Sequence, residues 1–134
     1  MSVILHLSNA LLFVIAWIVQ LWVYPKFVRP GGAPLINNLL YKAVIVVLTL
    51  PAMTVQGIYH SLNLYYAPGW IHIIQWLCML ITVPLTFAYA VPVHLKMSRE
   101  GNSESLVKRL LSIHSVRTAC WTIILILDFV KFRI

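Results

Sequence analysis

Four long apolar runs divide the chain, and each is long enough to cross a lipid bilayer as one helix. They cover residues 3–24, 39–62, 70–93 and 106–129. A membrane-spanning helix needs about 20 mostly apolar residues, because the hydrocarbon core of a bilayer is about 30 Å thick. The pattern therefore predicts an all-α fold, a four-transmembrane-helix bundle, in which residues 1–134 form a single integral membrane domain.

Polar side chains recur within these runs at offsets of three, four and seven residues, which share one face of a helix. The stripes contain His6, Asn9, Phe13, Trp17, Gln20 and Tyr24; Asn38, Lys42, Thr49, Gln56, His60 and Asn63; His72, Gln75, Met79, Thr82, Thr86 and Ala90, with His94 at the edge; and His114, Arg117, Thr118, Trp121 and Asp128. A charged side chain that faces lipid costs about 2.5–3.5 kcal/mol on insertion scales. We therefore expect all four stripes to point inward and to give the bundle a partly polar interior.

Composition agrees with a membrane protein, since 61% of the residues are hydrophobic and only 10% are charged. A soluble domain carries about 25% charged residues. The net charge of +7 comes largely from loops, with Lys26 and Arg29 after the first run and Lys96 and Arg99 after the third. By the positive-inside rule these loops are cytoplasmic and both termini lie outside. The expected partners are membrane lipids and no nucleic acid.

The stripes divide into two layers by depth, because consecutive spans run in opposite directions. The outer layer holds three histidines and one carboxylate, which are side-chain types that bind zinc, iron or copper. These candidate metal ligands are His6, His60, His72 and Asp128. No two of them share a helix at a spacing of three or four residues, so the sequence favours the alternative of interfacial histidines that contact water or headgroups. Haem is a related alternative, with an axial pair of His6 and His60 or of His94 and His114.

The inner layer holds Arg117, the deepest charge in any run. Its guanidinium stays protonated in proteins, and when buried it needs an anionic or carbonyl partner. The only acid within a run, Asp128, lies about three helical turns away. We therefore expect Arg117 to orient the acidic or carbonyl group of a lipophilic small molecule, with His114 or His94 as the acid–base group. The residues expected to assist or to wall this substrate site are Gln20, Tyr24, Lys42, Trp17 and Trp121. In the alternative without a ligand, Arg117 donates hydrogen bonds to helix carbonyls and only holds the helices of the bundle together.

Four short motifs resemble those of a family of small four-span bacterial membrane proteins without an assigned activity. The matching elements are Gln20 with Tyr24-Pro25-Lys26-Phe27, Tyr41 and Ile45 with Pro51-Ala52-Met53, Val91-Pro92-Val93-His94, and Val116-Arg117-Thr118-Ala119-Cys120-Trp121. The last motif is the most specific, because Arg and Trp are both unusual within a span. The resemblance covers most of the chain and implies the four-span fold and a bacterial inner-membrane location, but no activity.

Two positions depart from the pattern of that family. Asn38 stands where the family typically has His, and His114 stands where it typically has Asn. The matching residues on the cytoplasmic side favour the inner layer over the outer histidines as the site. A looser likeness, resting on the last span alone, is to anthrone-oxygenase-like membrane proteins. Those proteins are also small four-span bundles, and they oxidise aromatic substrates without a cofactor.

Three functions remain open from the sequence. The leading hypothesis is a membrane-embedded enzyme or binding protein for a lipophilic small molecule, and such an enzyme would be a cofactor-independent isomerase, lyase or oxygenase. The second is a metal- or haem-binding protein built on the outer histidines. The third is a non-catalytic accessory or assembly protein, whose polar stripes hold helices together within one chain or in a homo-oligomer.

Overall fold

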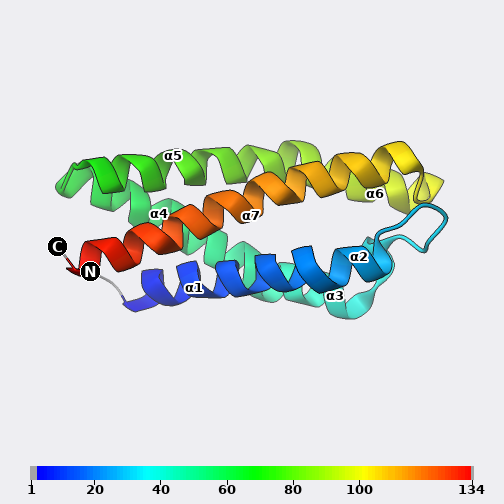
Figure 1. Ribbon diagram of the computed structural model, residues 1–134, viewed down its shortest axis with the longest axis horizontal. Helices are drawn as coiled ribbons and strands as arrows, with labels where there is room; N and C mark the ends of the chain where they lie inside the picture. Colours follow the sequence, from blue (N-terminus) through cyan, green and yellow to red (C-terminus); the bar gives the residue numbers. More distant parts are fainter. Residues whose placement is uncertain (1–2, 134) are drawn as a thin grey trace.

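Four long helical rods pack side by side in the computed structural model, which describes residues 3–133 and all of their side chains except those at 27, 36, 132 and 133 (Figure 1). The rods cover Val3–Lys26, Leu39–Tyr66, Trp70–Glu100 and Glu104–Lys131, and each is long and apolar enough to cross a membrane. The chain is therefore an all-α four-helix bundle and a multi-pass integral membrane protein, as its apolar runs predict. Both ends of the chain lie at one end of the bundle (Figure 1).

Short π-helical turns interrupt three of the four rods. The first rod consists of α1 (Val3–Ile18), η1 (Val19–Val23) and α2 (Tyr24–Phe27); the second of α3 (Leu39–Val44), η3 (Ile45–Thr49) and α4 (Leu50–Tyr66); and the third of α5 (Trp70–Pro84), η4 (Leu85–Ala90) and α6 (Val91–Glu100). The fourth rod is the single helix α7 (Glu104–Arg133), and a short 3₁₀ turn, η2 (Leu35–Asn37), precedes α3. All three π turns lie in the half of the bundle away from the chain ends.

Each π turn ends two residues before a proline, at Pro25, Pro51 and Pro92. Proline has no N–H to donate, and its ring crowds the carbonyl four residues earlier. The residue just before each of these prolines donates its N–H to the carbonyl five residues earlier, which is the bond of a π turn. The wider turn thus accommodates the proline within a continuous rod.

The π turns also rotate one part of each rod relative to the other. A π turn holds about one residue more than an α turn, so residues beyond it are rotated by about 100° from where an unbroken α-helix would place them. In the second rod the shift buries Tyr41 and exposes Lys42. The expected inward position of Lys42 is therefore wrong. The same kind of shift places Tyr24 and His94 fully on the buried face.

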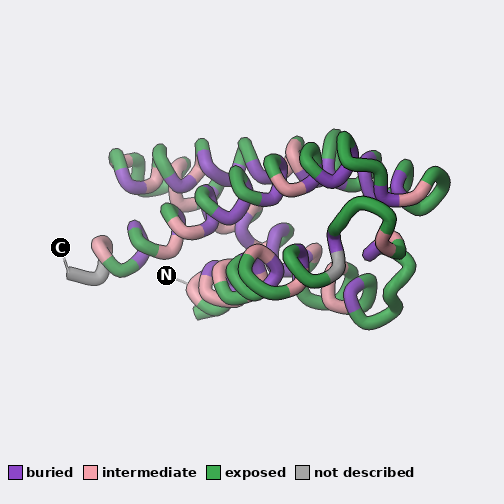
Figure 2. The backbone as a smooth tube through the Cα atoms, turned by 45° about the vertical axis from the view of Figure 1, so that its right-hand side comes forward, coloured by how far each residue is buried: buried purple, intermediate pink, exposed green. Residues whose placement is uncertain are grey.

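Buried residues follow the inward sides of the helices, and the outward sides are exposed (Figure 2). Two apolar clusters fill the interior, one at the level of the π turns around Tyr24, Tyr41 and Met97, and one nearer mid-bundle around Leu12 and Trp121. The outward sides carry large apolar side chains that suit contact with lipid tails. Most polar stripe residues are buried in the interior between these sides, as expected.

The third helix is longer than its apolar run, because it continues to Glu100 through residues expected to lie in a loop. Val93, His94 and Met97 continue the buried face across this segment. Gly101 ends the helix with a φ of 87°, a left-handed conformation that glycine adopts without steric cost. The next residue, Asn102, donates its side-chain N–H to the Ala33 carbonyl at 3.3 Å and so ties this loop to the loop before α3.

Candidate functional site

Arg117 lies near the middle of α7 and is only 7% exposed. Its Nη1 donates to Thr86 Oγ1 at 3.2 Å, and its Nη2 donates to His114 Nδ1 at 3.1 Å. The guanidinium carbon lies 5.8 Å from the centroid of the buried Trp121 ring, and Nε is buried with no hydrogen-bond partner among the described residues. No carboxylate among residues 3–133 forms an ion pair with Arg117. The cation is thus buried against neutral groups only.

Both ring nitrogens of His114 are already engaged. Nε2 donates to the Ala16 carbonyl at 3.1 Å, and this bond requires the proton to be on Nε2. Nδ1 is then unprotonated and accepts from Arg117. The centroid of the His114 ring also lies 4.6 Å from that of Tyr24. His114 therefore orients the guanidinium, and in this structure both of its ring nitrogens are hydrogen-bonded within the protein.

A chain of side chains runs from Arg117 to His94 through two buried tyrosines. The Tyr24 hydroxyl lies beside the Arg117 guanidinium and 3.2 Å from the Tyr41 hydroxyl. The Tyr41 hydroxyl lies within 3.5 Å of His94 Nε2. His94 Nδ1 is buried and has no partner in the described part of the chain. Of the two histidines expected to act as acid–base groups, His94 is therefore the one with an unengaged nitrogen.

A small cavity of about 70 Å³ lies among these groups. Its lining residues are Tyr41, Ile45, Thr86, Ala90, Val91, His94, Leu95 and Arg117. The volume corresponds to about two water molecules, so it matches a carboxylate or carbonyl group and not a whole lipophilic molecule. Groups from α3, η4, α6 and α7 converge on it, and two π turns, η3 and η4, contribute to its wall.

The remaining residues expected at the substrate site lie apart from this cavity. Trp17 is 36% exposed and its Nε1 donates to Thr122 Oγ1 at 2.9 Å. Gln20 Nε2 donates to Ser115 Oγ at 3.2 Å. Both bonds join the first rod to α7 near the surface of the bundle. The exposed Lys42 does not line the cavity either.

Tyr41 and Thr86 line the cavity but were not among the predicted site residues. Thr86 belongs to the polar stripe of the third run, and an uncharged hydroxyl at that position gives little indication of a role. Tyr41 is one residue away from the predicted stripe, because of the π turn that follows it. Two signals in the sequence could have indicated Tyr41. One is the mid-span proline Pro51, and the other is the motif with Tyr41 and Ile45 on which the resemblance to the four-span family rests.

The outer polar layer forms a hydrogen-bond network around Asp128. Its carboxylate accepts from Asn9 Nδ2 at 2.6 Å and from Gln75 Nε2 at 2.9 Å. His6 Nδ1 lies 3.2 Å and Lys131 Nζ lies 3.8 Å from the carboxylate. The charge of Asp128 is therefore met by donors from α1, α5 and its own helix.

The network extends from Asp128 to the second rod through the amide of Asn9. Asn9 Oδ1 accepts from Gln56 Nε2 at 2.8 Å and lies 3.3 Å from His60 Nε2. In residues 3–133 the structure shows no group of three or more His, Cys, Asp or Glu side chains arranged to hold a metal ion. The candidate ligands His6 and Asp128 contact each other. His60 instead contacts the Asn9 amide, which separates it from Asp128.

No protein-family model, no curated protein and no solved structure matches this chain. The resemblance to the small four-span bacterial family and to anthrone-oxygenase-like proteins therefore stays a prediction. The site rests on its own geometry, in which a buried arginine, a tyrosine and a histidine line one cavity and a second tyrosine, Tyr24, contacts the first.

Proposed function

We propose that this membrane protein binds the acidic or carbonyl group of a lipophilic small molecule inside the bundle, against Arg117. The observation that carries the proposal is the buried guanidinium, which lines a cavity of about 70 Å³ and has no carboxylate partner among the described residues. A buried charge without a partner is strongly unfavourable. An anionic or carbonyl group in the cavity supplies that partner and accepts from Nε and Nη of the guanidinium in a short, charge-assisted geometry.

The chemistry that these residues support best is proton transfer. A guanidinium that donates to a carbonyl oxygen stabilises the enolate formed when a proton leaves the neighbouring carbon. His94 lines the same cavity and takes that proton on a ring nitrogen. Where the substrate carries a C=C bond next to that carbon, the anion is a dienolate, and returning the proton to its far carbon shifts the double bond and completes an isomerisation. The step needs no external oxidant or reductant. Tyr41 and Tyr24 connect His94 with Arg117 and polarise both ends of the site.

The test is to purify the protein gently in a mild detergent and to analyse it by native mass spectrometry, with organic extraction of the same sample. The wild type should retain one acidic or carbonyl-containing lipophilic molecule per chain. Arg117→Gln should lose it, because a neutral amide leaves the anionic group without a charged partner.

Arg109→Gln is the matched control, since it removes an exposed positive charge from the same helix. It should retain the molecule at the level of the wild type. Bulk phospholipid alone on the wild type, with no difference between the two variants, would refute the proposal.

A further inference from the structure

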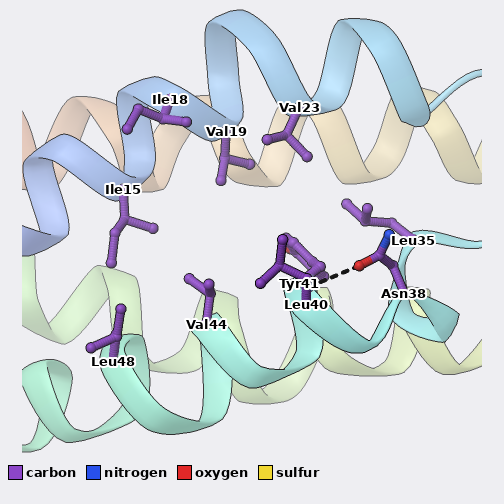
Figure 3. Close-up of a pocket in the computed structure, with 10 residues that line it drawn as sticks. All are labelled: Ile15, Ile18, Val19, Val23, Leu35, Asn38, Leu40, Tyr41, Val44 and Leu48. Carbon is purple, nitrogen blue, oxygen red and sulfur yellow. Dashed lines mark hydrogen bonds between the residues drawn. The ribbon is translucent and has the colours of Figure 1, made fainter.

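A second, larger cavity lies between the first two rods and opens toward the lipid. Its volume is about 370 Å³, and apolar side chains from α1, η1, α3 and η3 form nearly all of its wall. Ile15 and Val19 point across it toward Val44 and Leu48 (Figure 3). The only amide in the wall, that of Asn38, already accepts from the Tyr41 N–H at 3.0 Å. We call this space the apolar groove.

The apolar groove and the small cavity at Arg117 share one wall, the side chain of Tyr41. This residue lines both spaces, and it is the only one that does so. Its hydroxyl is directed to the polar side, where it meets Tyr24 and His94. The π turns η1 and η3 also contribute to the wall of the groove, through Val19 and Leu48. Such widened turns within helices are frequent at functional sites.

From this arrangement we infer that the ligand is a single-chain carboxylate, a fatty acid or a close analogue. Its hydrocarbon chain lies in the apolar groove, and its carboxylate reaches Arg117 when the Tyr41 side chain, which separates the two spaces, turns aside. The inference rests on the proposed function and adds the class of the ligand and its route of entry from the lipid. Charge complementarity argues for this occupant, because the Arg117 cation, which has no carboxylate partner among residues 3–133, lines the small cavity on the other side of Tyr41 from the groove.

Two volumes argue against a phospholipid as the specific ligand. The small cavity, at about 70 Å³, takes a carboxylate but not a phosphodiester with its glycerol and headgroup. The groove, at about 370 Å³, is at the lower end of the range of small-molecule sites, about 300–1,000 Å³. It is a single slot between two rods, which suits one chain rather than two.

The experiment uses a palmitic acid analogue that carries a photoactivatable diazirine at mid-chain, added to the full-length protein in lipid nanodiscs. Irradiation and peptide mass spectrometry then locate the adducts. Adducts should concentrate on Ile15, Val44 and Leu48 relative to lipid-facing residues elsewhere, such as the exposed Ile126. An excess of palmitic acid should abolish this labelling, and hexadecane, which lacks the carboxylate, should not.

Two matched variants test the groove itself. Val44→Phe fills the groove and should reduce groove labelling at least fivefold, whereas Val46→Phe adds the same ring to the exposed, lipid-facing side of the same rod and should leave it unchanged. Leu48→Trp fills the groove from the next turn and replaces Val44→Phe if that variant does not fold. Binding of hexanoate, too short to fill the groove, should survive in each folded groove variant and disappear in Arg117→Gln.

The outcomes separate the groove from the head-group site. Groove labelling that depends on Arg117 and on an unfilled groove supports the inference. Adducts spread evenly over all lipid-facing surfaces, with hexanoate binding still dependent on Arg117, overturn the groove and leave the proposed function standing. If neither acid binds in a manner that depends on Arg117, the proposed function falls and the inference falls with it.

Discussion

At the scale of single residues, the environment of Arg117 depends on His114, which does not line the small cavity and acts through the guanidinium. His114→Leu should weaken hexanoate binding about tenfold or more, because it removes a hydrogen bond to a charged group worth about 1.5–3 kcal/mol. His114→Asn keeps a carbonyl oxygen as an acceptor and should restore most of the affinity. Isothermal titration of both variants checks this. Equal losses in the two variants would show that His114 matters only as packing volume.

Tyr41 offers a test of proton transfer that does not depend on knowing the natural reaction. Tyr41→Phe keeps the ring that separates the two cavities and removes the hydroxyl that meets Tyr24 and His94. Deuterium uptake from solvent at the carbon next to the carbonyl group of a bound lipophilic ketone should slow by about 10²-fold or more, the range of general acid–base effects. Ligand retention should not change. Unchanged exchange would remove Tyr41 from the proton path.

In the outer layer, Asn9 connects three of the four rods through a single side chain. Asn9→Ala leaves the Asp128 carboxylate and the Gln56 amide without this partner, and it should lower the free energy of unfolding by about 1–3 kcal/mol. Thermal unfolding in detergent measures this, with the exposed Ser112→Ala as the control. A loss no larger than that of Ser112→Ala would mean that water replaces the amide at no cost.

The sequence predicts some of these residues well and others not at all. Arg117 stands out because a charge deep in an apolar run has few ways to be accommodated, and the structure buries it as expected. The bonds of Asn9 and the occupied nitrogens of His114 depend on which helices are neighbours and at what height. Neither can be read from spacing along one helix.

At the scale of elements, the apolar runs predict the four rods and their order. They do not predict which residues near the ends of the rods point into the bundle. A helical wheel of constant pitch places Lys42 inward, and the π turn at Ile45–Thr49 puts Tyr41 there instead. The proline two residues after the turn is a local signal for it. Proline alone is not sufficient, however, because the segment before Pro84 is regular α-helix.

The register across this π turn can be measured directly. In a background where Cys78 and Cys120 are replaced by Ala, Lys42→Cys should react readily with a water-soluble maleimide, and Tyr41→Cys should be protected. Lys42 is exposed near the end of its rod and Tyr41 is buried. Mass spectrometry of the labelled protein gives both rates. The opposite order of reactivity would indicate an uninterrupted α-helix and would contradict the position of Tyr41 in the cavity wall.

At the scale of the whole molecule, the bundle is apolar outside and contains two polar layers whose buried charges are met in different ways. The outer layer neutralises its charge internally, since Asp128 lies close to several donors including Lys131. The inner layer presents the Arg117 cation to a cavity beside a groove that opens to lipid. The buried Arg117 charge, without a carboxylate partner in the described part of the chain, supports the binding role proposed for the inner layer. The orientation with both termini outside stays a prediction from the loop charges.

The most direct test of the account is whether a carboxylate sits on the Arg117 guanidinium. Solid-state NMR on protein with ¹⁵N-labelled arginine side chains and bound hexanoate labelled with ¹³C at the carboxyl carbon measures the dipolar coupling between the two. The account predicts a carbon–nitrogen distance of about 4 Å or less, as a charge-assisted hydrogen bond requires, and its loss in Arg117→Lys. Bound hexanoate without any coupling to arginine nitrogen, or a coupling that persists in Arg117→Lys, would contradict it.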